Sequence, residues 1–520
     1  MSLNGADADV LALIKRLKTA NIFPLVENGQ LKFRAHSAAA LTDELRQAIL
    51  RHKTRLISSW PMWESQGEVD ESIPPSFDAG IGSSSFVQVL QHHQGLWNSM
   101  ASGRPGVDVT NLTHFVCRAS RSVASDSVRN FFKEVAARHP ILRRRVITKN
   151  SRYVFSPPDD ECPSHIYTDV SNDDSHSRGQ LLSSTISTLV WKPFDSLAGS
   201  LFRSFHVRVD ENEHVLGFVI HHFVADFTSV GILAGELLTH LGRGELPPIS
   251  TRDINYMDYV VGIDNWLNSE ASTPSRRYWE SVLRDALPTR LPRLTHDSVV
   301  REGTAAIEVF HVPQENCLAL RSLAAACRVT PFCLFLGLNM FALATISGAT
   351  DITMLIDTSC RMNPRLSSTI GYLVNFLPIR FSISMEQTLE DLLLTISNLW
   401  RNGERHLYYP YYTLSPDLTR VGTPDVFPVL NYINRPNFAR ENGVEPMDIG
   451  APPIVTPTKN FIDSHYTQLE MSNNGLLGRI HYPPWMYSRE TVLRFIELYI
   501  ELLDKCVDSR RLTLTELLAC

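Results

Sequence analysis

Two adjacent histidines followed by an aspartate are the residues of this chain whose types and spacing are best suited to chemistry. They lie in the run His221-His222-Phe223-Val224-Ala225-Asp226, between an apolar strand-like segment at residues 215–220 and a helix-like segment that begins near Thr228. A loop at the end of a buried strand can hold a histidine rigidly at a cleft, where it can act as a general base or position a proton. Because side chains alternate along a strand, one histidine would face the cleft and the other the scaffold. From these residues alone, a pair of structural histidines is an equally good interpretation, since short motifs also occur by chance.

The elements that must position these residues belong to a chain of 520 residues, which is long enough for two or three domains. A hydrophobic content of 43% and a charged content of 20% are typical of a soluble globular protein. The net charge of −6 gives no indication of nucleic-acid binding. No apolar run approaches the ~18 residues that a membrane-spanning helix needs, and no Gly-rich phosphate-binding loop precedes a helix.

The eight cysteines include no Cys-x-x-Cys pair, so we expect reduced thiols without a metal or disulfide role. The first residues of the chain lack the basic and apolar regions of a secretory signal. These features together predict a cytoplasmic protein. A metal site built from His221, His222 and Asp226 is disfavoured, because no further ligands cluster near them in the sequence.

A break in composition at residues 61–83, rich in Pro, Gly and Ser, predicts a linker behind a small N-terminal module at residues 1–60. Residues 10–17 and 42–57 of this module have apolar positions at helical spacing, and Asn28-Gly29 between alternating apolar positions predicts a β-hairpin. Nine Lys and Arg against five Asp and Glu give the module a charge of +4, so the rest of the chain must carry −10. This basic charge indicates an interaction surface, although a merely solvated surface is an equally good interpretation.

Residues 6–60 carry an ordered motif: Leu25-Val26, Gly29, Leu31, Phe33-Arg34-Ala35, Leu41-Thr42, Leu45 and Lys53-Thr54-Arg55-Leu56-Ile57. With this motif the segment resembles the tubulysin-type (TubC-like) N-terminal docking domain of nonribosomal peptide synthetase subunits, a small α+β domain with a β-hairpin. In that family the exposed hairpin edge accepts a short, often acidic, C-terminal segment of the upstream subunit as an added strand, because an edge strand offers unpaired backbone groups. The resemblance implies a docking surface at Leu31, Lys32, Phe33 and Arg34, with the upstream synthetase subunit as partner.

A second ordered series of motifs runs through residues 84–520. It consists of Trp97, Arg138-His139-Pro140-Ile141-Leu142-Arg143, Pro193-Phe194-Asp195, Leu201-Phe202-Arg203, the run from His221 to Asp226, Tyr256-Met257-Asp258-Tyr259, Tyr278-Trp279, Thr330-Pro331-Phe332, Ser347-Gly348, Asp351-Ile352, Gly371-Tyr372-Leu373-Val374-Asn375-Phe376-Leu377-Pro378, His406, Pro410 and Phe427-Pro428-Val429-Leu430. This part of the chain resembles a condensation domain of a nonribosomal peptide synthetase, whose HHxxxD motif corresponds to the histidine run.

The resemblance implies an α/β fold of two chloramphenicol-acetyltransferase-like lobes in a V-shaped pseudodimer, with an N-terminal lobe at residues 84–250 and a C-terminal lobe at residues 251–520. The active-site loop would lie at the junction, in a tunnel open at both faces. The implied activity is amide bond formation between a donor acyl or peptidyl thioester and an acceptor aminoacyl thioester. Donor and acceptor carrier proteins would be the partners. They would supply 4′-phosphopantetheine, and the chain itself would bind no cofactor.

The residue roles that the resemblance implies centre on a catalytic set of His222, His221 and Asp226. His222 corresponds to the histidine that accepts or organises the proton of the attacking amine, either as a base or by orienting the amine and stabilising the tetrahedral species. His221 is expected to pack behind the loop, and Asp226 to form an ion pair with Arg361. Asn375 is expected either to line the tunnel or to cap a loop. The scaffold or interface residues would be Arg138, His139, Arg143 and Tyr256.

Two departures from the family pattern bear on the reaction. Phe227 stands where the family has Gly, so it could narrow the tunnel or shape a substrate pocket, and the first motif has Leu90 and His93 at positions where the family has Ser and Gln. The motif has His221 where cyclising relatives have Asp, which disfavours heterocycle formation. Besides amide condensation, two alternatives stay open: a same-fold acyltransferase that uses a free amine or alcohol, and a catalytically impaired recruitment module with a blocked tunnel.

Overall fold

The computed structural model describes residues 22–27, 30–35, 48–49, 74–77, 87–88, 112–149, 152–161, 163–172, 175–194, 199–244, 246, 253–294, 306–414, 427–434, 442–449 and 464–519. The chain divides into two compact units, Met1–Glu71 and Ser72–Cys520. In the first unit, strands β1 (Ile22–Glu27) and β2 (Gln30–Ala35) form the predicted antiparallel hairpin, in which Val26 pairs with Leu31. The turn at Asn28-Gly29 and the helix predicted at residues 10–17 lie outside the described residues, as does the predicted helix at 42–57 except for residues 48–49, which are helical.

The N-terminal lobe of the second unit is built on a sheet of five strands in the order β14-β4-β9-β8-β7. Strand β9, the third in this order, is buried along its whole length, as its nearly continuous apolar sequence predicts. Strands β7 and β8 are parallel, and helix α6 lies between them in sequence, whereas the other neighbouring pairs are antiparallel. The elements of this lobe are β4 (Leu112–Ala119), α5 (Ser125–Arg138), β7 (Ser164–Asp169), α6 (Ser175–Trp191), β8 (Phe202–Arg208), β9 (His214–His221) and α7 (Phe227–Arg243), with a small antiparallel sheet of β3 (Val87–Gln88), β6 (Arg152–Phe155) and β5 (Val146–Lys149).

Strand β14 (Val444–Pro446) belongs to this first sheet although it comes late in the sequence. It pairs antiparallel with β4, so that Val444 lies opposite Ala119, and the backbone N–H of Met447 donates to the carbonyl of Val116 over 2.9 Å. The chain therefore returns from the C-terminal lobe to complete the N-terminal sheet, and residues near 444 within the range predicted for the C-terminal lobe contribute to the other lobe.

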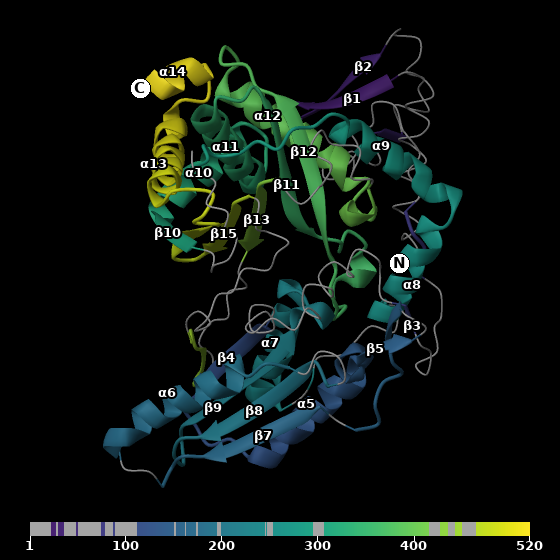
Figure 1. Cartoon of the computed structure of the whole chain (residues 1–520), viewed down its shortest axis with the longest axis vertical. Helices are drawn as coiled ribbons and strands as arrows, with labels where there is room; N and C mark the ends of the chain where they lie inside the picture. Colours follow the sequence, from purple (N-terminus) through teal and green to yellow (C-terminus); the bar gives the residue numbers. More distant parts are fainter. Residues whose placement is uncertain are drawn as a thin grey trace. The chain divides into compact units, whose positions relative to one another are not determined.

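The C-terminal lobe is built on a sheet of six strands in the order β10-β16-β15-β13-β11-β12. Strand β11 lies between β13, to which it is parallel, and β12, to which it is antiparallel. Figure 1 shows helices α10, α11 and α13 gathered beside this sheet. The elements are α8 (Tyr256–Leu267), α9 (Thr273–Leu283), β10 (Ala306–Pro313), α10 (Gln314–Ala326), α11 (Pro331–Ser347), β11 (Asp351–Ser359), β12 (Val374–Ser382), α12 (Leu389–Glu404), β13 (Val429–Asn434), β15 (Tyr466–Ser472), β16 (Gly475–Tyr482), α13 (Arg489–Lys505) and α14 (Leu514–Ala519). Short 3-10 turns are η3 (Pro140–Arg143), η4 (His222–Val224), η5 (Glu270–Ser272), η6 (Pro364–Leu366), η7 (Tyr411–Thr413) and η11 (Cys506–Asp508).

Helix α11 forms the centre of the C-terminal core, and the signals that bound it are visible in the sequence. Thr330 caps its first turn by accepting a hydrogen bond from the N–H of Cys333 at 3.2 Å, Pro331 occupies the first helical position, and Gly348 ends it with φ of 69°. The helix is apolar on all sides because it packs against α10, α12 and α13. Among the described residues no single helix is long and apolar enough to cross a membrane, and α10 and α11 pass that test only as a pair bent by 99°.

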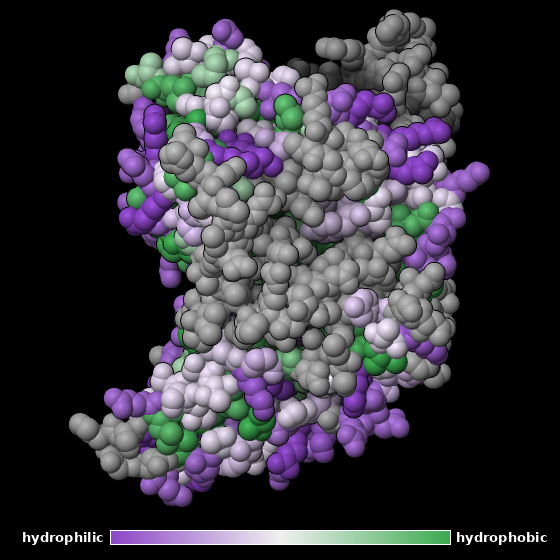
Figure 2. All heavy atoms as spheres, viewed as in Figure 1, coloured by the Kyte–Doolittle hydropathy of each residue, from purple (hydrophilic) through white to green (hydrophobic). Residues whose placement is uncertain are grey.

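The described surface shows no large apolar patch on the face drawn in Figure 2, where apolar side chains form separate spots among hydrophilic ones. Exposed large apolar residues are scattered over many elements, as is ordinary for a globular protein. One of them, Phe227 at 38% exposure, lies directly after the histidine run.

Candidate active site between the two lobes

The predicted strand end carries His221 into the interior of the N-terminal lobe. Its side chain is fully buried, and its Nδ1 accepts a hydrogen bond from the backbone N–H of Phe223 over 3.0 Å, which caps the short turn η4. The ring of Phe194 lies edge-on with centroids 6.3 Å apart. Burial and the neighbouring His222 lower the pKa of His221 to about 3, so its imidazole is neutral at physiological pH. We therefore assign His221 a structural part in shaping the loop.

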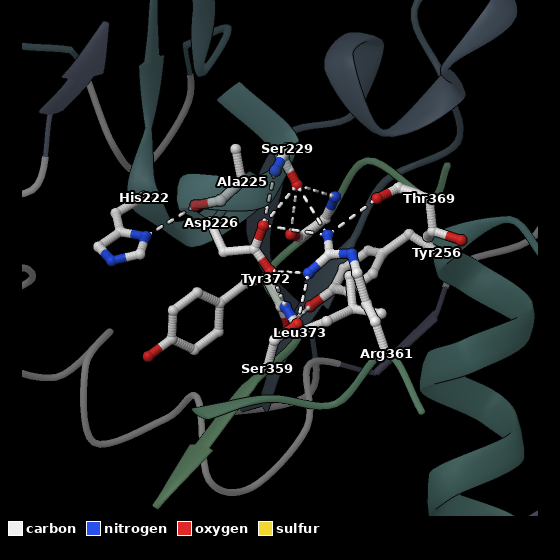
Figure 3. Close-up of polar contacts among 11 residues, drawn as sticks. His222, Ala225, Asp226, Ser229, Tyr256, Ser359, Arg361, Thr369, Tyr372 and Leu373 are labelled. Carbon is white, nitrogen blue, oxygen red and sulfur yellow. Dashed lines mark hydrogen bonds and ion pairs between the residues drawn. The ribbon is translucent and has the colours of Figure 1, made fainter. Parts of the chain in front are cut away.

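The side chain of His222 points in another direction and is partly exposed. Its Nδ1 lies 2.7 Å from the carbonyl oxygen of Ala225. Because a carbonyl can only accept a hydrogen bond, Nδ1 must carry the hydrogen, and the neutral ring then has its lone pair on Nε2. The ring of Tyr372 from the C-terminal lobe packs edge-on against this imidazole with centroids 5.1 Å apart. Figure 3 shows the imidazole pointing away from the neighbouring ion pair of Asp226. Such a ring can accept a proton at Nε2 without losing its hold on the loop.

Asp226 forms the ion pair with Arg361 that the family resemblance implies, and this pair joins the two lobes. Arg361 Nη2 donates to Asp226 Oδ1 over 3.0 Å, and Arg361 Nη1 donates to Asp226 Oδ2, so the contact is bidentate. The exposed fractions of the two side chains are only 8% for Arg361 and 3% for Asp226. Figure 3 shows both side chains within a dense network of polar contacts.

The rest of this network satisfies the two buried charges from both lobes. Asp226 Oδ1 also accepts from the backbone N–H of Ser229 at 2.8 Å, which caps helix α7, and Oδ2 accepts from the backbone N–H of Leu373 at 3.1 Å. Arg361 donates further to the carbonyl of Thr369 at 2.9 Å and to the hydroxyl of Ser359 at 3.0 Å. A buried ion pair is tolerated only when such additional hydrogen bonds satisfy its remaining atoms.

Ser229 adds a second link between the lobes beside the ion pair. Its hydroxyl lies 2.8 Å from Asp226 Oδ1 and 2.9 Å from the carbonyl oxygen of Gly371, and it accepts from the N–H of Gly371 at 3.1 Å. The N–H of Asp226 also donates to the carbonyl of Gly371 over 3.1 Å. A side chain at Gly371 would collide with the ring of Tyr256, since a Cβ there would come within 2.1 Å of it. The glycine therefore lets the loop before β12 pack directly on the ring of Tyr256 while its backbone bonds to Asp226 and Ser229.

The structure separates the remaining predicted site residues into different environments. Phe227 is the first residue of α7 and keeps 38% of its surface exposed. Asn375 is buried, and its amide group makes four hydrogen bonds to backbone atoms: it donates to the carbonyls of Leu407 and Tyr409 and accepts from the N–H groups of Phe376 and Tyr411. With its amide used in this way, Asn375 fits the loop-capping alternative rather than the tunnel-lining one.

The residues expected to serve as scaffold make structural contacts. Arg138 and His139 both reach the buried carboxylate of Glu236 on α7, at 3.0 Å and 3.4 Å. The hydroxyl of Tyr256 donates to the carbonyl of Tyr372 at 3.2 Å. Trp97, Leu90 and His93 lie outside the described residues. The docking residues Leu31, Lys32, Phe33 and Arg34 all lie on β2, where the structure describes the backbone only.

Sequence reasoning missed several residues that complete the site. Tyr372, Ser229 and Ser359 approach the histidine loop or its ion pair, and Asp357 on β11 lies close enough to His222 and Asp226 for their charges to change its pKa. Tyr372 belongs to a family motif, but the motif alone does not place its ring. No local pattern distinguishes Asp357, because its neighbours in space come from other strands.

The sequence profile of the condensation-domain family matches residues 108–518, and that of the TubC N-terminal docking domain matches residues 10–59. The first match covers most of the chain and contains every described residue of the histidine loop and its ion pair. The chain belongs to the condensation-domain family, and it carries an N-terminal docking domain of the TubC type.

Similar proteins include large peptide synthetases. Malpinin synthetase of Mortierella alpina is 27% identical over 316 residues, which is 58% of this chain and 4% of that protein. A linear gramicidin synthase of Brevibacillus parabrevis is 25% identical over 390 residues, which is 72% of this chain and 8% of that protein. The chain thus spans less than a tenth of the length of these relatives.

Solved structures share the fold. One is a condensation domain that mediates chain release from the enacyloxin polyketide synthase. It has a TM-score of 0.67 and 18% identity, and the match covers 98% of each chain. The X-domain from teicoplanin biosynthesis also has a TM-score of 0.67, with 16% identity over 85% of this chain and 99% of that one. These likenesses confirm the predicted α/β condensation-domain fold.

Replacing Arg361 by Met should destabilise the protein strongly, because it leaves Asp226 buried without a counter-charge. We expect a loss of about 3–5 kcal/mol in the free energy of unfolding, measured by urea denaturation. The matched control is Arg118→Met, which breaks an ion pair with Glu213 whose side chains are 38% and 31% exposed and should cost no more than about 1 kcal/mol. Equal losses in the two variants would contradict the structural weight given to the buried pair.

Proposed function

We propose that this chain catalyses amide bond formation between an acyl thioester on a donor carrier protein and an amine on an acceptor carrier protein. The observation that carries the proposal is the fixed tautomer of His222: the Nδ1–H is held by Ala225, so Nε2 is left to accept a proton at the junction of the two lobes. The membership of the condensation-domain family and the synthetase relatives support the same activity.

The proposed reaction uses the chain's own residues to position one proton. The amine nitrogen attacks the thioester carbonyl and forms the C–N bond, and His222 Nε2 accepts or orients the proton that the nitrogen must lose. The tetrahedral species collapses, the C–S bond breaks, and the thiolate of the donor's 4′-phosphopantetheine arm takes the proton. The arm belongs to the partner carrier protein and acts as substrate. We expect the reaction to take place in the cytoplasm.

An alternative hypothesis is that the chain is a recruitment module. Its support is the likeness to the X-domain, which was solved in a complex with OxyB from teicoplanin biosynthesis. The partly exposed His222 and its braced loop favour catalysis in this chain, because a module that only recruits needs no histidine with a fixed tautomer and an accessible ring. An acyltransferase that uses free amines or alcohols would employ the same histidine. A comparison of carrier-bound with free acceptors distinguishes this activity from amide condensation between carriers.

Replacing His222 by Ala should reduce acyl transfer at least about a hundredfold while leaving the fold intact, because general-base catalysis typically contributes 10²–10⁴. Donor carriers loaded with octanoyl, phenylacetyl or alanyl groups would be mixed with acceptor carriers loaded with glycine, alanine or phenylalanine, and intact-protein mass spectrometry would record the mass gained by the acceptor. His311→Ala, which removes a histidine bonded to the carbonyl of Asn474, is the matched control and should retain activity.

Transfer that persists in His222→Ala would contradict the role of this histidine. Transfer only to free amines or alcohols, added in place of the acceptor carriers, would favour the alternative of a same-fold acyltransferase that uses a free nucleophile. No transfer from the wild-type protein to any of these acceptors would favour the recruitment module.

The proposed function includes docking of an upstream synthetase subunit on the N-terminal hairpin. In the described residues β2 pairs with β1 only, so its other edge is open to an added strand in this part of the chain. Two residues of β2, Lys32 and Arg34, are basic. A basic edge strand suits a short acidic segment.

Reversing both charges, Lys32→Glu with Arg34→Glu, should weaken binding of acidic C-terminal peptides of candidate upstream subunits about tenfold at low salt, and less at high salt. Calorimetric titration would measure the dissociation constant. Reversal of Arg51 and Lys53 in the same module gives the same net charge and is the control. An equal loss in both double variants would indicate a nonspecific charge effect and contradict docking at the hairpin.

A further inference from the structure

A second ionisable group lies near His222, contributed by the C-terminal lobe. Asp357 is located near the end of β11, and its Oδ2 accepts a hydrogen bond from the hydroxyl of Tyr466 over 3.0 Å. The same hydroxyl accepts from the side-chain amide of Asn431 over 2.8 Å. The three residues come from the adjacent strands β11, β13 and β15, and Asp357 and Asn431 are direct partners in the sheet register. The carboxylate is thus held by a relay that runs across the sheet.

The register of β11 places Asp357 on the side of the strand that meets the histidine loop. Ser359 accepts a hydrogen bond from Arg361, which is bound to Asp226. Side chains two residues apart share one face of a strand and lie about 6.6 Å apart along it. The side chains of Asp357 and Ser359 therefore lie on the same face of β11, with Asp357 two residues before the end of the strand. The charges of His222 and Asp226 both change the pKa of the Asp357 carboxyl group. The charge of Asp357 in turn raises the pKa of Tyr372, whose ring packs on that of His222.

The environment of Asp357 is crowded and yet accessible. Asp357, His222, Tyr372 and Tyr466 are all half-buried residues. Burial raises the pKa of Asp357 to about 6, while the hydrogen bond from Tyr466 and the charge of His222 lower it and the charge of Asp226 raises it. Among the described residues no arginine, lysine or histidine forms an ion pair with Asp357. A carboxylate in this setting gains from binding a cation that enters the site.

The proposed reaction brings such a cation to the site. An α-amino group has an ordinary pKa of about 7.7–8.0, so an acceptor amine arrives mostly as an ammonium at pH 7. An ammonium has no lone pair and cannot attack a carbonyl. One proton must leave before attack and a second after it, whereas His222 Nε2 holds only one proton at a time.

We propose that Asp357 binds the ammonium group of the acceptor and takes its first proton, so that a free amine reaches the thioester carbonyl beside His222. This inference rests on the proposed function and names the acceptor class: a substrate whose nucleophile enters as a primary ammonium. One proton moves from nitrogen to the Asp357 carboxylate and then to solvent. The amine forms the C–N bond, its second proton passes through His222 to the departing thiolate, and the C–S bond breaks. Tyr466 acts as a positioning residue, because it holds the carboxylate and does not itself meet the substrate in this scheme.

The test is a binding comparison that does not depend on turnover. Alanyl-aminopantetheine is a stable amide mimic of an aminoacyl thioester with an ammonium group, and lactyl-aminopantetheine carries a neutral hydroxyl in its place. At pH 7 the wild-type protein should bind the alanyl compound at least about tenfold more tightly, as expected for a charge-assisted contact in a partly buried site. Asp357→Asn should lose this preference while it binds the lactyl compound within about twofold of wild type. Asp351→Asn alters an exposed carboxylate on the same strand, paired with Arg380, and should keep the preference.

The pH dependence gives a second readout. Because the carboxyl titrates near 6 in the folded protein, the preference should be present at pH 7 and decline as the pH falls to 5, when Asp357 becomes protonated. His222, Asp226, Tyr372 and Tyr466 face the same group, so the comparison with Asp357→Asn, which should show no such decline, isolates its contribution. Tyr466→Phe removes a hydrogen bond that lowers this pKa, and the midpoint of the decline should move upward.

Equal preference for the alanyl compound in wild type and Asp357→Asn would overturn the inference and leave the proposed function standing, provided that the wild-type protein forms amides in the carrier assay. Saturable binding of neither compound to the wild-type protein would contradict the proposed function and the inference together. The melting temperature of each variant checks the fold. We expect Asp357→Asn to be at least as stable as wild type, because an amide avoids the cost of burying a charge.

Discussion

The buried ion pair of Asp226 and Arg361 is the interaction on which the rest of the site depends. Asp226 is the last residue of the histidine motif and caps helix α7, whereas Arg361 follows strand β11 of the other lobe. Burying two charges is costly, and the cost is offset here by the bidentate contact and by hydrogen bonds from Ser229 and Leu373. The same contacts fix the loop that carries His222 relative to the strand that carries Asp357. The position of His222, the proposed proton acceptor, is therefore set by both lobes together.

The two histidines of the motif illustrate how one short turn creates two environments. His221 completes a buried strand and is kept neutral by burial, and its ring nitrogen supports the turn. His222 begins the turn and hydrogen-bonds to Ala225 through Nδ1, which leaves Nε2 for the proposed proton transfer. Across the junction, Asp357 has a raised pKa of about 6 and is held by Tyr466. The proposed reaction has two proton transfers, and the junction offers one proton-accepting group from each lobe.

The fold and the histidine loop could be predicted from the sequence, whereas many of the contacts around the loop could not. The hairpin of β1 and β2 follows from a local turn signal, and the pairing of Asp226 with Arg361 follows from the resemblance to the condensation-domain family. Strand β14 could not be foreseen, because its three residues are too few to show a period and its partner β4 is more than three hundred residues away. Asp357 was missed for a similar reason: the role proposed for it depends on Tyr466, Asn431 and His222, which only the folded sheet brings near it. Asn375 had two open readings, and only the hydrogen bonds to Leu407 and Tyr409 distinguish them.

By fixing the histidine loop, the ion pair between the lobes is expected to hold His222 in the tautomer with hydrogen on Nδ1. Nitrogen-15 NMR of histidine-labelled protein, at a pH where the imidazole is neutral, measures this tautomer directly. We expect the Nδ1–H form in the wild-type protein and a mixture of tautomers in Arg361→Met, in which the loop is no longer fixed. A wild-type His222 with its hydrogen on Nε2, or a tautomer unchanged by the loss of Arg361, would contradict it.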